Sequence, residues 1–170
     1  MKKQHAFFAV VAFQLLSLVD MIGTKYATVL YGQTVILETR PIDPRDLLRG
    51  DFVRLNFAIT NLDPGTLGAG GYVLESGDAV YVLLQKSSPA WTAVGVSRER
   101  PSLGPDQAVI KGTVRGADRS AIRVDYGIDS YYVPEHTGRS VERLRYWRVK
   151  LGRRGGAVIE GPATEADTGG

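Results

Sequence analysis

The chain has 170 residues, of which 44% are hydrophobic and 23% charged, and its formal net charge is +3. This balance fits one folded domain plus an anchor and excludes a disordered chain, and the mild charge gives no reason to expect a nucleic-acid partner. Cysteine is absent, which excludes disulfides, thiolate metal sites and cysteine nucleophiles. Twenty glycines and eight prolines, placed between short β-rich runs, predict an all-β domain with many turns.

The first predicted element is a membrane-spanning helix. Residues 6–22 read AFFAVVAFQLLSLVDMI, a run of about 17 residues with one acid, close to the shortest length that spans a bilayer. Lys2 and Lys3 precede the run, which favours an N-terminus in the cytoplasm and a remainder outside it. We therefore expect residues 1–31 to form the cytoplasmic N-terminus and a single anchor in the cytoplasmic membrane. A cleaved signal peptide and a buried helix of a soluble domain are the alternatives.

A series of short strands follows the anchor. Residues 52–59 alternate strictly between apolar and polar side chains, as a strand with one buried face does. The long run at 61–77 is rich in Gly and Pro and predicts a loop, while 46–49 and 138–144 predict short helical segments. The strands are expected at residues 34–40, 52–59, 79–85, 91–97, 108–114, 121–126, 130–133, 145–151 and 157–160.

Strands of this length and spacing predict a closed or partly closed antiparallel barrel or sandwich, because closure removes the exposed edges that many short strands create. We expect this extracytoplasmic β domain to cover residues 32–161. The small, polar tail at 162–170 is expected to be disordered.

The most specific stretch is residues 43–57, DPRDLLRGDFVRLNF. Its second half, GDFVRLNF at 50–57, resembles the motif of the GDYXXLXY family, bacterial membrane-anchored proteins without an established function. Phe stands at both tyrosine positions, so the hydroxyls are not obligatory chemistry here. The resemblance implies a single-pass membrane protein and no particular activity. The residues that it marks for motif or packing roles are Phe52, Leu55, Phe57, Tyr132, Pro134 and Glu142.

The charged corner of this stretch provides the candidate binding residues. The four carboxylates among them could bind a hard cation, but their spacing does not match the ligand positions of an EF-hand loop. Turn capping with ion pairing to arginine is the favoured explanation. With histidine only at positions 5 and 136, we expect no metal site, no cofactor and no catalytic histidine. The candidate binding residues are Asp43, Arg45, Asp46, Arg49, Gly50, Asp51, Arg54 and Glu135.

Two segments are also similar, more weakly, to type I signal peptidases and LexA-like peptidases. Residues 47–53 resemble the segment that follows the nucleophilic serine, and residues 110–118 the segment that carries the general-base lysine, here Lys111. A Ser–Lys dyad needs a hydroxyl beside a desolvated amine, and residues 41–46 contain neither Ser nor Thr. The similarity therefore favours a non-catalytic relative of that β fold over a peptidase.

The basic and aromatic run RLRYWRVKLGRR at 143–154 has two interpretations, a solvated strand face or a surface for anionic lipid or an acidic partner. Taken together, the sequence predicts a non-catalytic binding or accessory module for other membrane or envelope proteins. The alternative is an envelope enzyme, either peptidase-like through Lys111 or a hydrolase that uses Asp51 and Glu135 as acid and base.

Overall fold

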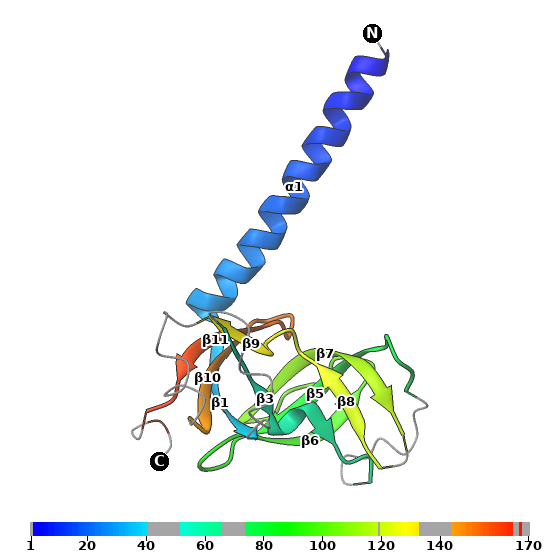
Figure 1. Ribbon diagram of the computed structural model, residues 1–170. Helices are drawn as coiled ribbons and strands as arrows, with labels where there is room; N and C mark the ends of the chain where they lie inside the picture. The colour runs from blue at the N-terminus through cyan, green and yellow to red at the C-terminus, as the bar shows by residue number, and fades with distance from the viewer. Residues whose placement is uncertain are drawn as a thin grey trace.

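The computed structural model describes residues 2–40, 52–65, 74–118, 120–132, 144–164 and 167. A single long helix, α1, projects from one end of a β domain (Figure 1). The predicted order of an N-terminal apolar helix followed by an all-β domain is confirmed.

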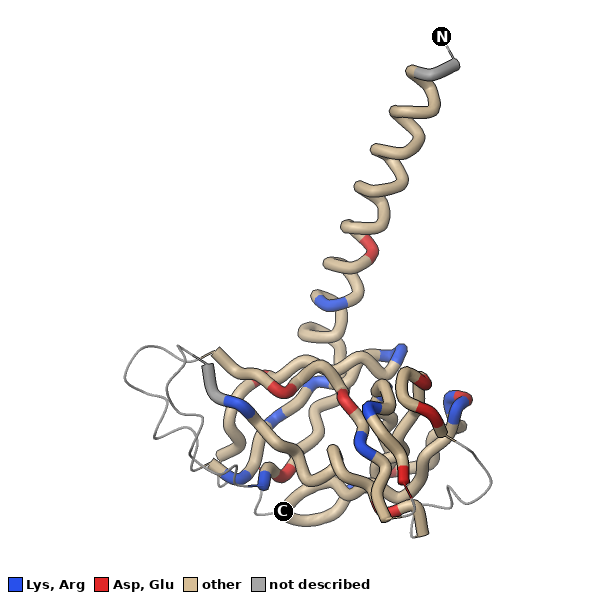
Figure 2. The backbone as a smooth tube through the Cα atoms, turned by 45° about the vertical axis from the view of Figure 1, so that its right-hand side comes forward, with Lys and Arg blue, Asp and Glu red and all other residues tan. Residues whose placement is uncertain are grey.

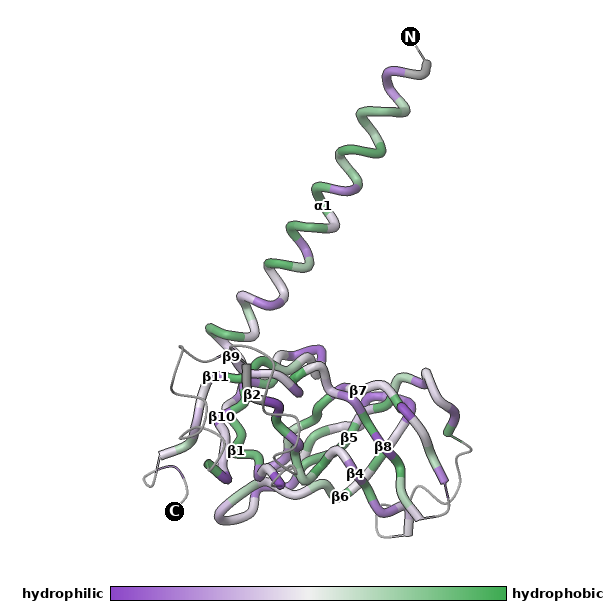
Figure 3. The backbone as a smooth tube through the Cα atoms, in the orientation of Figure 1, coloured by the Kyte–Doolittle hydropathy of each residue, from purple (hydrophilic) through white to green (hydrophobic). Residues whose placement is uncertain are grey.

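Helix α1 covers Lys2–Tyr31, 30 residues without interruption. Its side chains are mostly exposed, and apolar residues lie on all its sides (Figure 3). Hydroxyl side chains within it bond back to the helix backbone: Ser17 donates to the carbonyl of Phe13 at 2.9 Å, and Thr24 to that of Met21 at 3.0 Å. Such back-bonding satisfies a hydroxyl in an apolar medium. By length and composition, Gln4–Tyr31 is suited to crossing a membrane, and its exposure excludes the buried-core alternative.

The β domain contains a four-stranded sheet in the order β11-β10-β1-β3, a five-stranded sheet in the order β4-β8-β7-β5-β6, and the two-stranded ribbon β2-β9. One sheet curls into a half-barrel and the other stays open, so the predicted closure is partial. The strands are β1 (Gln33–Arg40), β2 (Phe52–Arg54), β3 (Asn56–Phe57), β4 (Asn61–Leu62), β5 (Ala79–Gln85), β6 (Thr92–Ser97), β7 (Gln107–Ala117), β8 (Ile122–Asp125), β9 (Ser130–Tyr132), β10 (Tyr146–Leu151) and β11 (Ala157–Pro162), with a 3-10 turn, η2, at Ala58–Thr60.

A single core joins the sheets. Trp147, Val149 and Leu151 alternate with half-buried residues along β10, as their spacing predicts, and Leu37 of β1 lies opposite Trp147 in the register. Tyr131 of β9 stands edge-on to Trp147, with ring centroids 5.0 Å apart, a favourable aromatic arrangement. The same buried cluster contains residues of both large sheets, so the β domain folds around one apolar centre.

The described residues of the C-terminal tail, 162–164 and 167, lie against β10. Pro162 is the last residue of β11, and the next amide, of Ala163, donates to the carbonyl of Tyr146 at 2.9 Å. Asp167 accepts hydrogen bonds from Thr164 and pairs with Arg148 at 3.2 Å. These polar contacts hold the tail to β10. The expected helical segment at 46–49 lies outside the described residues. Of the segment expected at 138–144, only residue 144 lies within them.

Candidate functional site

The motif stretch is a crossover between sheets. The expected single strand at 52–59 is wrong, because the chain changes its pairing partner twice: β2 pairs with β9, β3 with β1, and β4, after the η2 turn, with β8. Where the pairing partner changes, other hydrogen bonds satisfy the backbone groups. The amide of Leu55 donates to the carbonyl of Asp129 at 2.8 Å, and the Tyr126 hydroxyl to the carbonyl of Ile59 at 2.7 Å.

The alternation of burial nevertheless persists through the crossover. Leu55, Phe57 and Ile59 are 7%, 2% and 5% exposed, whereas Arg54 is exposed. Leu55 and Phe57 therefore lie in the core, and the Tyr126 hydroxyl bonds to the η2 turn that follows them. Burial also raises the pKa of the Tyr126 hydroxyl, which keeps it a hydrogen-bond donor at all physiological pH values.

Two segments that the family resemblance marks come together in the β2–β9 ribbon. Phe52 lies opposite Tyr132, and Arg54 opposite Ser130. Tyr132 is 79% exposed, so this candidate residue and Arg54 present their side chains to solvent. The remaining candidates lie outside the described residues, namely Asp43, Arg45, Asp46, Arg49, Gly50, Asp51, Pro134, Glu135 and Glu142.

Lys111, the position of the peptidase general base, is exposed on β7. Its ammonium nitrogen lies 5.9 Å from the ring centroid of Tyr81 on β5, directly across the register. This is a surface cation–π contact, not the desolvated environment that activates a lysine nucleophile or base.

Two aspartates of the described domain, Asp118 and Asp125, stabilise turns by accepting backbone hydrogen bonds. The backbone amide of Gly127 and the guanidinium of Arg115 lower the pKa of Asp125, and the hydroxyl and amide of Ser120 lower that of Asp118. Within the described residues, no group of three or more His, Asp or Glu side chains is placed to hold a metal ion.

The basic and aromatic run is also divided by the fold. Arg145 pairs with Glu38 at 2.7 Å, Arg148 pairs with Asp167, and Trp147 is buried. In the turn after β10, Arg153 and Arg154 are exposed. Among the described residues of the run, the bases are therefore divided between ion pairs and this exposed turn.

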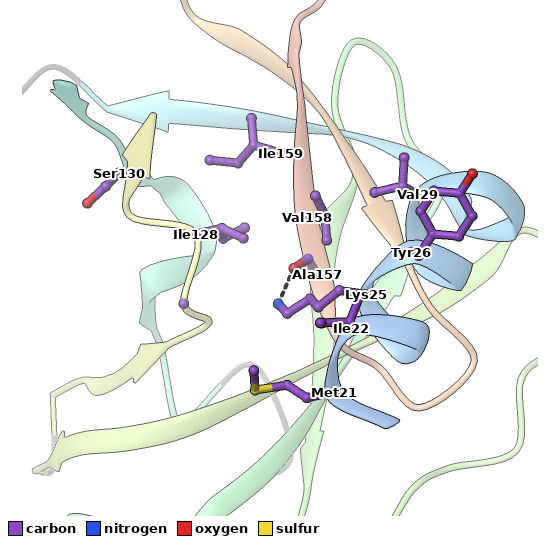
Figure 4. Close-up of a pocket in the computed structure, with 11 residues that line it drawn as sticks. Met21, Ile22, Lys25, Tyr26, Val29, Ile128, Ser130, Ala157, Val158 and Ile159 are labelled. Atoms are coloured by element: carbon purple, nitrogen blue, oxygen red, sulfur yellow. Dashed lines mark hydrogen bonds between the residues drawn. The ribbon is translucent and has the colours of Figure 1, made fainter. Parts of the chain in front are cut away.

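Sequence reasoning missed a groove at the foot of the helix. It has a volume of about 580 Å³ and lies between α1, the β8–β9 connection and β11 (Figure 4). The ammonium of Lys25 reaches the carbonyl of Ala157 at 3.4 Å. The residues that line it are Met21, Ile22, Lys25, Tyr26, Val29, Gly127, Ile128, Ser130, Ala157, Val158 and Ile159.

The last turn of α1 beside this groove is packed into the β domain. Thr28 is only 8% exposed, and a Cβ on Gly152 would collide with its hydroxyl. Gly32 donates its amide to the carbonyl of Thr28 at 2.9 Å, and a side chain there would strike the same carbonyl. Two glycines thus permit the close approach of helix and sheet. They are the one signal in the sequence from which this junction was predictable.

Comparison with known proteins gives one match. A family model described as GDYXXLXY protein matches residues 14–161, from within α1 to the end of the β domain. No curated protein and no solved structure matches the chain.

Proposed function

Because the chain belongs to the GDYXXLXY family, we propose that it is a single-pass protein of the cytoplasmic membrane that serves as a binding or accessory module for another membrane or envelope protein. Its N-terminus lies in the cytoplasm and its β domain outside. The observation that carries this proposal is the junction between α1 and the β domain.

An apolar N-terminal helix is either an anchor or a signal sequence. The junction favours an anchor, since the last helical turn is part of the folded domain through Thr28, Gly32 and Gly152. Removal of the helix would uncover the surface of β10 and β11 that this turn covers. A segment meant for cleavage has no need of such contacts.

The composition of α1 supports a domain seated directly at the membrane surface. A bilayer core of about 30 Å takes about 20 helical residues, and from Ala6 this length ends at Lys25. Lys25 and Tyr26 are suited to the headgroup level. Because α1 continues unbroken into the junction, the β domain follows with no flexible linker.

The described surface supports binding over catalysis. An enzyme places its acid, base or nucleophile in a concave, partly desolvated site. Here Lys111 is exposed, the perturbed aspartates cap turns, and the concave feature at the helix is apolar. Concave apolar surface with few polar groups is typical of a binding site.

The topology is tested by cysteine labelling, which the absence of native cysteine makes unambiguous. Gln4→Cys and Ser102→Cys variants are treated with a membrane-impermeant maleimide in intact spheroplasts and after lysis. Ser102 lies in the exposed loop before β7, so its variant should be labelled in both conditions and the Gln4 variant only after lysis. The reverse pattern, or a mature chain lacking its first 31 residues, would refute the anchor.

The binding role is tested by crosslinking in membranes followed by pull-down. Wild type is compared with Asp51→Ala in the motif, and with Glu99→Ala, an exposed acid outside the motif sequence, as control. We expect Asp51→Ala alone to lose crosslinked partners. Identical partners for all three proteins, with normal folding, would exclude the motif corner as the interaction site.

A further inference from the structure

We propose that the groove at the foot of α1 binds one anionic phospholipid of the surrounding membrane. This inference rests on the proposed anchoring of α1 and identifies a ligand for the surface next to it. The site is named here the foot groove and consists of the residues that line it between α1 and β11.

The position of the foot groove matches the level of lipid headgroups. Its lining begins with Met21 and Ile22, at the end of the apolar span, and continues through Lys25 to Val29. An acyl chain that lies along Met21 and Ile22 therefore brings its phosphate to the level of Lys25, about 20 residues from Ala6. One wall of the groove is thus continuous with the bilayer, which makes a membrane lipid the nearest source of a ligand.

The chemistry of the lining matches an amphipathic anion. Ile128, Val158 and Ile159 provide an apolar floor and far wall, and Lys25 points into the space from the helix side (Figure 4). Lys25 is the only charged residue that lines the groove in the described part of the chain. A basic head beside apolar walls is complementary to a phosphate attached to acyl chains.

The ammonium of Lys25 has capacity for such a ligand. It carries three donors, and within the described residues it donates to the carbonyl of Ala157 at 3.4 Å, which is long for a charged hydrogen bond. The phosphate oxygens of a lipid would satisfy the other donors without displacing a carboxylate. An intramembrane protein partner would have to bring its own acid to this position, whereas an anionic lipid supplies the charge by itself.

Further positive charge lies close to the foot groove. Gly152 packs against Thr28 at the end of α1, and Arg153 and Arg154 follow it as exposed residues of the β10–β11 turn. Figure 2 shows basic positions on the side of the β domain nearest the helix. These bases raise the local concentration of anionic lipid, while the groove selects a single molecule. Its volume of about 580 Å³ lies within the range of about 300–1,000 Å³ typical of small-molecule sites.

The test is native mass spectrometry of the full chain, delipidated in detergent and titrated with an equimolar mixture of phosphatidylglycerol and phosphatidylcholine of the same acyl chains. We expect one phosphatidylglycerol retained with about fivefold preference, the contribution of one lysine at a membrane surface. Lys25→Gln should abolish the preference, and Val29→Trp, which fills the groove from an exposed position, should reduce retention of both lipids. The controls are Lys86→Gln and Val94→Trp, exposed residues outside the groove.

Equal retention of both lipids by the wild type, or an undiminished preference in Lys25→Gln, would overturn the proposal. Flotation of the same full-length proteins with phosphatidylcholine vesicles separates this outcome from failure of the anchor. A chain that floats but shows no preference refutes the lipid site alone. A chain that does not float refutes the anchor, and the lipid site with it.

Discussion

Replacing Gly152 with alanine is expected to loosen α1 from the β domain. The added Cβ would collide with the Thr28 hydroxyl and lie 3.2 and 3.3 Å from Thr28 Cβ and Cγ2. Thr28 cannot turn away freely, because its hydroxyl donates to the carbonyl of Thr24 at 2.9 Å and its side chain is buried. Overpacking of this kind costs about 1–3 kcal/mol. We expect the free energy of unfolding to fall by that amount.

The assay is denaturant unfolding of the full chain in detergent, followed by the fluorescence of the two buried tryptophans, Trp91 and Trp147. Gly156→Ala in the same turn is the matched control, since nothing lies within 4 Å of its added Cβ. Thr28→Ala removes the colliding hydroxyl and the Cγ2 methyl. The double variant should therefore be more stable than the sum of the two single effects predicts, by about 0.5–2 kcal/mol. A neutral Gly152→Ala, or strict additivity with Thr28→Ala, would refute the packed junction.

Two further predictions concern the β domain. Phe57→Ala should lower the free energy of unfolding by about 3–5 kcal/mol, because the ring is 2% exposed. Arg54 is exposed in the same motif, so Arg54→Ala should change it by less than about 0.5 kcal/mol. If the two variants lose similar amounts of stability in denaturant unfolding, the burial assigned to the crossover is wrong. Gly127 and Arg115 hold the pKa of Asp125 below its usual value, so the stabilisation is present above the unfolded pKa near 3.9 and is lost as pH falls below it. The melting-temperature gap between wild type and Asp125→Asn should therefore close from about pH 5 to about pH 2, and a gap that persists in acid would exclude this carboxylate as its source.

Side-chain periodicity predicted those elements whose burial and pairing agree. The sequence YWRVKL of β10 alternates, and the structure buries Trp147, Val149 and Leu151 along it. The apolar run of α1 predicted its helix, because 30 residues without proline leave no point at which it must stop. In these elements one local pattern determines both the backbone conformation and the buried face.

Pairing partners are not encoded in that pattern. Residues 52–59 alternate correctly, yet the chain passes from β9 to β1 and on to β8 within and just after them. The alternation survives because both large sheets pack on one core, so the same face stays buried whichever strand lies alongside. Alternation of apolar and polar residues specifies which face of a strand is buried, whereas the tertiary fold specifies which strand pairs with it.

The foot groove was not predictable for a related reason. Its walls come from three places far apart in the chain, α1, the β8–β9 connection and β11. Each residue has an ordinary local explanation: Met21 and Ile22 as part of the span, Lys25 as a lysine at a helix end, Ile159 as a strand residue. Only their juxtaposition creates a concave apolar surface with one cation.

Helix α1 is connected to the motif through a single strand, β1. β1 begins at Gln33, two residues after α1 ends, and runs unbroken to Arg40, where Thr39 lies opposite Phe57 and Arg40 opposite Asn56. If α1 spans the membrane as proposed, the Thr28 junction and β1 set the orientation of the described motif residues relative to it, with no loop between α1 and β1. The described apolar residues of the motif pack in the core, so in the proposed binding role they would act by determining which surface of the β domain is presented.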